Sequence, residues 1–202
     1  KKKIILIFDE MITGLRHEGS SIQDILKLSP TMSTFGKCLG GGLPIGIIAI
    51  KKNIETKLLK KGKKVFFGGT FSGNSVNTYV ANSVTNFILK NKRDIFRDLN
   101  KKSEYFVKKL NFFFLNNKFD AKCLRVGSLI RIVFTNKNAL NRSQRDFLEK
   151  KNFNNIKKFR NFLFNKNIFY PTSGIIFFST ETNYKEINFL IKNIKLGFKK
   201  IF

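Results

Sequence analysis

The apolar run at residues 4–8 (IILIF) constrains the fold of this chain more than any other stretch. It is rich in β-branched and aromatic residues, and it ends at Asp9 and Glu10. Such a run predicts a strand that is covered on both faces, as in a parallel sheet. Because ligands gather at the carboxyl ends of strands in open α/β sheets, Asp9 is a candidate ligand-binding residue. The alternative is that Asp9 is a turn or helix-cap acid.

Strands and helices are predicted to alternate in the first part of the chain. The segment 21–28 is predicted to be a short helix, and 31–35 is predicted to be the next strand. That strand leads into Lys37, three glycines follow, and 45–50 is predicted to be a further strand. A strand, helix, strand unit brings the ends of its strands to one edge of the sheet, so Asp9 and Lys37 are expected along the same edge.

Lys37 is the candidate nucleophile. A lysine becomes a nucleophile only where desolvation or neighbouring positive charge favours its neutral amine. The end of an apolar segment that opens into Gly40, Gly41 and Gly42 can supply such a place. The alternative is one more surface lysine followed by a glycine loop.

The stretch 65–74 is the second one with recognisable chemistry. Its glycines surround small hydroxyl and amide side chains, and a long amphipathic helix is predicted directly after it; these residues are Gly68, Gly69, Thr70, Ser72, Gly73 and Asn74. Backbone N–H groups at a helix N-terminus, with hydroxyl side chains beside them, form an anion site suited to phosphate. Serine and asparagine are also the most common helix caps, which is the alternative interpretation.

The pattern of elements changes near residue 120. Apolar residues recur at helical spacing over 75–116, which predicts two helices, or one bent helix, with a break near Asn91. The elements predicted beyond it are strands at 123–126, 128–135, 168–170 and 175–179, helices at 156–165 and 187–201, and a partly ordered polar segment at 136–155. We therefore expect an α/β domain over residues 1–118 and a smaller α+β domain over residues 119–202.

The charge of the chain points at first to a nucleic-acid partner. The 39 basic and 13 acidic residues give a formal net charge of +26. However, Lys outnumbers Arg by 31 to 8, and Phe, Asn and Ile are also abundant, all of them residues with adenine- and thymine-rich codons. Genome base composition explains the whole set, whereas nucleic-acid binding explains only the lysines. Because the basic residues are spread along the chain and no recognition motif occurs, no nucleic-acid partner is expected.

No metal site, disulfide or membrane segment is predicted. Cys38 and Cys123 lie far apart without metal-like spacing, and His17 is the sole histidine. The apolar runs are too short for a spanning helix or a signal peptide, so a cytoplasmic protein without a membrane partner is expected. Since residue 1 is not Met and the chain opens almost directly on a strand, we expect a fragment of a longer protein.

Three motifs occur in an order that matches a known family. They are LIFDEMITGLR at 6–16, TFGKCLGGGLPIG at 34–46 and GGTFSGN at 68–74. With these motifs and the segment NIFYPTSGIIFFSTET at 167–182, the chain resembles the class III pyridoxal-phosphate (PLP) aminotransferases, and within them the glutamate-1-semialdehyde aminomutase branch. The resemblance covers essentially the whole chain. It implies the PLP-dependent transferase fold type I, with the C-terminal part of the large parallel-sheet domain followed by the small domain.

The resemblance also implies a role for each candidate residue. Lys37 would form a Schiff base with PLP and later move the proton between the substrate α-carbon and the cofactor. Asp9 would pair with the protonated pyridine nitrogen and keep the ring able to accept electrons. Gly69 and Thr70 would bind the cofactor phosphate. In this family the threonine binds the phosphate of the partner subunit, so the resemblance implies a homodimer with shared active sites.

One segment departs from the aminomutase pattern. That branch usually has a glutamate in the C-terminal segment, whereas 170–179 is shorter and has none, and Glu181-Thr182 replaces a histidine–threonine pair. We therefore favour a general class III aminotransferase, which exchanges an amino group between an amino donor and a carbonyl acceptor. The alternatives are glutamate-1-semialdehyde 2,1-aminomutase of tetrapyrrole biosynthesis and a truncated, non-catalytic remnant that keeps the fold.

Overall fold

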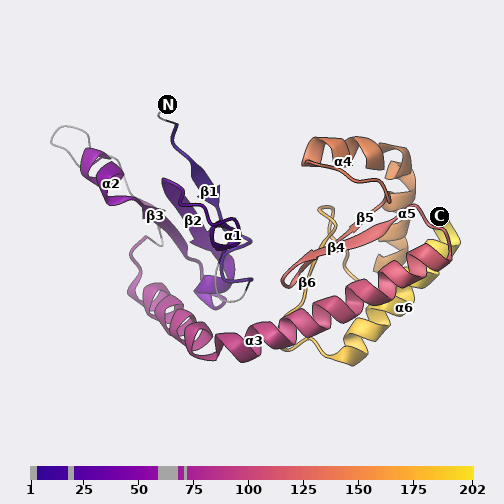
Figure 1. Ribbon diagram of the computed structural model, residues 1–202. Coiled ribbons are helices and arrows are strands. Elements are labelled where there is room, and N and C mark those ends of the chain that lie inside the picture. The colour runs from indigo at the N-terminus through magenta and orange to yellow at the C-terminus, as the bar shows by residue number, and fades with distance from the viewer. Residues whose placement is uncertain (1–3, 18–20, 59–67, 71) are drawn as a thin grey trace. The chain divides into compact units, whose positions relative to one another are not determined.

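The computed structural model describes residues 4–17, 21–58, 68–70 and 72–202 of the chain. The chain divides into two compact units, residues 1–96 and 97–202. Helix α3 (Ser75–Asn116) runs across the boundary between these units (Figure 1). The domain boundary expected at 118/119 stays a prediction. Within the described ranges, no helix is long and apolar enough to cross a membrane.

The first unit contains a three-stranded sheet. In their order across the sheet, the strands are β1 (Ile7–Asp9), β2 (Met32–Gly36) and β3 (Gly46–Ile50). As predicted, β1 and β2 are parallel and are connected through a short helix, α1 (Ile22–Ile25). Asp9 pairs in register with Thr34, so the end of β1 lies beside the end of the strand that leads into Lys37.

The third strand does not continue the parallel pattern. β3 is antiparallel to β2, with Gly36 paired to Gly46, so the expectation of a parallel sheet is wrong for this strand. A parallel connection needs a crossover of about a dozen or more residues. Here a 3₁₀ turn at Lys37–Gly40 and the glycines after it connect the two strands. This connection is too short for a parallel crossover, so the strands form a hairpin. Helix α2 (Lys52–Leu58) follows β3.

The apolar run at the start of the chain forms a strand only in its last part. Ile4 and Ile7 are 76% and 55% exposed. The predicted strand with both faces covered is therefore wrong within the described residues. The physical reason is the position of β1 at the edge of the sheet, where its apolar side chains have few neighbours.

Helix α3 is one continuous helix of 42 residues. The predicted break near Asn91 is wrong, because the helix runs without interruption from Ser75 to Asn116. The Asn91 side-chain amide donates to the carbonyl oxygen of Phe87 at 2.8 Å, one turn earlier in this helix. The helix contains neither Gly nor Pro. A single asparagine costs a helix less than about 1 kcal/mol, which the surrounding turns readily offset.

The second unit combines an antiparallel sheet with helices. Its strands are β4 (Lys122–Val126), β5 (Leu129–Val133) and β6 (Ile175–Phe177), and its helices besides α3 are α4 (Arg142–Glu149), α5 (Phe153–Phe164) and α6 (Tyr184–Ile201). Phe198 on α6 lies in the aromatic core, with its ring centroid 4.6 Å from that of Phe114 and 5.2 Å from that of Phe159. Burial of these rings supplies the main stabilisation of the unit.

Two predictions for the second unit need correction. The polar segment 136–155 is more regular than expected, because it contains α4, a 3₁₀ turn at Lys150–Asn152 and the start of α5. The Asn141 side chain begins α4 by accepting a hydrogen bond from the backbone N–H of Gln144 at 3.0 Å. The strand predicted at 168–170 does not form, and Tyr170 instead packs in the core beside Phe159.

Candidate active site

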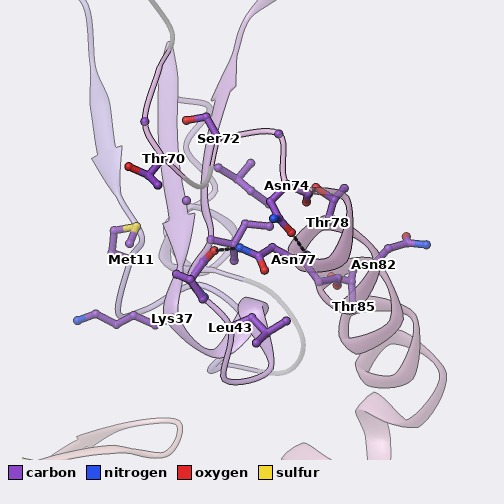
Figure 2. Close-up of a pocket in the computed structure, with 17 residues that line it drawn as sticks. Met11, Lys37, Leu43, Thr70, Ser72, Asn74, Asn77, Thr78, Asn82 and Thr85 are labelled. Atoms are coloured by element: carbon purple, nitrogen blue, oxygen red, sulfur yellow. Dashed lines mark hydrogen bonds between the residues drawn. The ribbon is translucent and has the colours of Figure 1, made fainter.

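A cavity of about 970 Å³ in the first unit gathers most of the candidate residues. The loop after β2, the start of β3, the described part of segment 69–74 and the first turns of α3 form its wall (Figure 2). Lys37, Gly69 and Thr70 all line this cavity. The structure therefore brings three of the four candidate residues, which are far apart in the sequence, around one space.

Lys37 follows β2 directly and has a left-handed backbone conformation, with φ at +50°. A non-glycine residue in this conformation costs about 1–2 kcal/mol. Leu15, Lys27, Lys118 and Asn167 also have a positive φ, so the conformation does not by itself mark a functional site. The side chain is exposed, and its amine points away from Asn77 and Thr85 of α3 (Figure 2). Within the described part of the chain, the amine forms no hydrogen bond or ion pair, and the desolvated surroundings expected from the sequence are not found around it.

Asp9 lies at the end of β1 but outside the lining of the cavity. Its Oδ1 atom accepts hydrogen bonds from the backbone N–H of Met11 and from the hydroxyl of Thr34, both at 3.1 Å. The strand pairing thus fixes the carboxylate at the sheet edge, one strand away from the segment that carries Lys37. Met11, two residues further along the chain, does line the cavity.

The segment that contains Gly69 and Thr70 ends in a capped helix N-terminus. The backbone N–H of Ser72 donates to the carbonyl oxygen of Gly69 at 2.9 Å, which closes a turn. Asn74 then caps α3, since its Oδ1 atom accepts from the backbone N–H of Asn77 at 3.0 Å. The interpretation of Asn74 as a helix cap is therefore confirmed. In Figure 2 the Thr70 hydroxyl points away from the first turn of α3.

Glu10 has a structural role that sequence reasoning did not assign. Its carboxylate is 1% exposed and accepts hydrogen bonds from the backbone N–H groups of Ile22 and Gln23 at 3.2 and 3.0 Å, and from the hydroxyl of Thr13. These bonds satisfy the N-terminus of α1. Consecutive strand residues point to opposite faces, and this alternation is the signal that could have separated Asp9 from Glu10.

Asn77 was also missed. This α3 residue lines the cavity, is 7% exposed, and donates a hydrogen bond from its side-chain amide to the carbonyl oxygen of Pro44 at 2.6 Å. An asparagine within a helical run normally indicates the solvent-facing side. The sequence therefore contained no signal that this asparagine is buried.

Comparison with known proteins places the chain in a family. The family model described as "Aminotransferase class-III" matches residues 1–157. The glutamate-1-semialdehyde 2,1-aminomutase of Fusobacterium nucleatum subsp. nucleatum is 30% identical over 203 residues, which cover 100% of this chain and 46% of the relative. The chain thus spans about half the length of the curated relatives it matches.

Solved structures share the fold at lower sequence identity. A variant glutamate-1-semialdehyde aminomutase from Pseudomonas aeruginosa PAO1, in complex with PMP, matches with a TM-score of 0.82 and 15% identity over 98% of this chain and 45% of that one. A transaminase with PLP bound matches with a TM-score of 0.76 and 18% identity over 98% of this chain and 44% of that one. The mixed α/β architecture is accordingly that of the PLP-dependent transferases of fold type I. The chain belongs to the class III aminotransferase family.

Proposed function

We propose that Lys37 is the catalytic lysine of a PLP-dependent class III enzyme, which transfers an amino group from an amino donor to a carbonyl acceptor. The observation that carries this proposal is the parallel pairing of β1 with β2, which places Asp9 in register with Thr34 on the strand that leads into Lys37. The family match, together with the similar transaminase structure that has PLP bound, supports the choice of cofactor.

The residues around the cavity fit PLP. This cofactor requires a primary amine for its aldehyde, an acid for its ring nitrogen and donors for its phosphate. Lys37 has an amine without a partner in the described residues, and the Asp9 Oδ2 atom accepts no hydrogen bond from them. The Thr70 hydroxyl and the first N–H groups of α3 are suitable phosphate donors.

Each residue then performs a distinct task. PLP supplies an electron sink for the carbanion that forms at the substrate carbon. The Nζ atom of Lys37 holds the cofactor covalently and afterwards carries the proton to and from that carbon. The Asp9 carboxylate holds the proton on the ring nitrogen, because an adjacent negative charge favours the protonated form. The Thr70 hydroxyl and the backbone of Gly69 would bind the phosphate of the cofactor held by the partner subunit.

We also propose that the whole protein is a homodimer with shared active sites. In this arrangement Thr70 donates to the phosphate of the cofactor bound by the partner subunit, as the class III motif GGTFSGN implies.

Covalent trapping tests the role of Lys37. The full-length protein is loaded with PLP and reduced with borohydride, and the labelled peptide is identified by mass spectrometry. We expect the label on Lys37, and we expect Lys37→Ala to carry none. Lys51→Ala is the control, because Lys51 follows β3 and donates to the carbonyl oxygen of Ser29 at 3.0 Å outside the cavity. A reduced cofactor that remains attached to Lys37→Ala would show that another residue is the nucleophile.

A second candidate reaction is the intramolecular one of glutamate-1-semialdehyde 2,1-aminomutase. The name of the 30% identical relative favours it. The C-terminal segment favours the transferase, because it has no acidic residue between Tyr170 and Thr180. Instead it forms a tight turn, in which the Gly174 N–H donates to the Pro171 carbonyl oxygen at 3.0 Å. Turnover of glutamate-1-semialdehyde without an added amino donor would identify the aminomutase.

A third candidate is a remnant that keeps the fold without binding the cofactor. The chain spans about half the length of its curated relatives, which is the observation that favours this possibility. Titration of the 202-residue chain with PLP, followed by absorbance, separates the two cases. Tight binding would exclude the remnant.

A further inference from the structure

Two donors converge on one oxygen atom of the Asp9 carboxylate. Its Oδ1 atom accepts a hydrogen bond from the backbone N–H of Met11 and another from the hydroxyl of Thr34, both at 3.1 Å. The bond from Met11 is local, because the two residues lie two positions apart in the turn after β1. The bond from Thr34 comes from the neighbouring strand, 25 residues further along the chain. Thr34 therefore ties the carboxylate to the strand that leads into Lys37.

The position of Thr34 in the sheet explains this contact. Thr34 lies on the central strand, where it is paired with Asp9 on one side and with Ile48 on the other. Paired residues on neighbouring strands direct their side chains to the same face, so the hydroxyl and the carboxylate meet. The carbonyl oxygen of Thr34 also accepts from the backbone N–H of Glu10 at 2.9 Å. A main-chain bond and a side-chain bond thus hold the end of β1 to this one residue.

The two bonds to Oδ1 decide which carboxylate oxygen is available to a ligand. The Oδ2 atom accepts no hydrogen bond from the described residues, so it can receive one from a bound cofactor. A group that is already oriented loses less freedom when its partner binds than a group that rotates freely. A hydroxyl that donates to a carboxylate also favours the ionised form of that carboxylate. The ionised form is the one that holds a proton on a ring nitrogen.

We propose that Thr34 is a positioning residue for Asp9, an inference that rests on the proposed function. Its hydroxyl orients the carboxylate so that Oδ2 stays available to the ring nitrogen of the cofactor that Lys37 holds. Asp9, Thr34 and Lys37 belong to the paired strands β1 and β2 and to the turn directly after them, so they act in one chain on one cofactor. Thr34 acts through Asp9, and no contact between Thr34 and the cofactor is needed.

The test compares three variants of the full-length protein, each loaded with PLP that carries the heavy nitrogen isotope in its ring. Thr34→Val keeps the shape of the side chain and suits a strand but lacks the hydroxyl, whereas Thr34→Ser keeps the hydroxyl. Thr31→Val is the matched control. The Thr31 hydroxyl oxygen also joins these two segments, but it accepts from the backbone N–H of Leu6 at 3.3 Å instead of donating to Asp9.

The NMR chemical shift of the labelled nitrogen, followed across pH, gives the pH midpoint at which the ring loses its proton. For Thr34→Val we expect this midpoint to fall by about one pH unit, equivalent to about 1.4 kcal/mol. The reason is that a carboxylate held less firmly stabilises the protonated ring less. Thr34→Ser and Thr31→Val should keep the midpoint of the wild type. Thr34→Ala is the second variant, for use if the valine variant does not fold.

The possible outcomes separate this inference from the proposed function. If Thr34→Val lowers only the melting temperature and leaves the midpoint unchanged, the residue is merely structural and the inference is wrong. The inference is equally wrong if Thr34→Ser lowers the midpoint as far as Thr34→Val does. Asp9→Asn removes the charge itself and should lower the midpoint further than Thr34→Val. If it does not move the midpoint, or if borohydride does not attach PLP to Lys37, the proposed function fails, and the inference fails with it.

Discussion

Lys37 combines a reactive group with an unfavourable backbone. Its φ of +50° lies in a region that glycine adopts freely and that other L-residues adopt at a cost of about 1–2 kcal/mol. A glycine at this position would therefore avoid the backbone cost that the lysine carries.

This strain gives a prediction at the scale of one residue. Lys37→Gly should be more stable than Lys37→Ala by about 1 kcal/mol, because only glycine relieves the left-handed strain. Both variants should fail to bind PLP covalently. Urea unfolding of the two variants measures the difference. Equal stability would contradict the assignment of strain to this backbone.

The residues of the candidate site could be predicted from their types and their order in the motifs. The residues that support the site could not be predicted in this way. Lys37, Gly69 and Thr70 were chosen from motifs, and the structure gathers them around one cavity. Glu10 and Asn77 escaped prediction for a common reason. Each acts by a hydrogen bond to backbone groups of another segment, at positions 22, 23 and 44, and a linear sequence does not indicate such tertiary partners.

At the scale of elements, local sequence patterns predicted which helices and strands exist better than they predicted the direction of each strand. The last helix was predicted from its apolar spacing, and α6 (Tyr184–Ile201) begins a few residues earlier than expected, at a capping box of Asn183 and Glu186. The direction of β3 was not predicted. It depends on how the short connection after Lys37 closes, which periodicity does not describe.

Packing between α5 and α6 gives the prediction at this scale. Gly197 lies within α6, and a Cβ atom there would be 2.8 Å from a ring carbon of Phe159, which is fully buried. In an exposed helix, replacement of glycine by alanine stabilises by about 1 kcal/mol. Here we expect Gly197→Ala to destabilise by about 1–3 kcal/mol, because the core ring has no space to move. Urea denaturation gives the sign, and a stabilised variant would be the contrary result.

At the scale of the whole molecule, the excess of positive charge governs the response to acid. The net charge is +26 at pH 7, and each of the 13 carboxyl groups that binds a proton adds one more positive charge. The few acidic residues therefore have a disproportionate role in limiting self-repulsion. Several are engaged with basic partners; for example, the Asp120 carboxylate lies 2.7 Å from the Nζ atom of Lys151.

Asp120 provides a pH-dependent test. Partial burial alone would raise its pKa, but hydrogen bonds from Lys151 and the Asn136 backbone N–H hold the pKa below its ordinary value. A carboxyl group with a lowered folded-state pKa stabilises the fold above its unfolded pKa of about 3.9, and this contribution disappears as the pH falls through the folded value. We expect Asp120→Asn to be less stable than the wild type at neutral pH and to approach it as the pH falls below the folded-state pKa of Asp120. Urea unfolding across this range measures the difference, which would stay constant if Asp120 made no such contribution.

The hairpin of β2 and β3 has a consequence for the order of assembly. Among its paired residues, Met32 and Ile50 are the farthest apart in the sequence. The turn that carries Lys37 lies between its two strands. Contacts this close in sequence have a low entropy of loop closure and form rapidly, whereas β1 reaches β2 only after the chain passes through α1. We therefore expect the lysine turn to acquire its shape early in folding. The proposed attachment point of the cofactor would then be formed before β1 completes the sheet.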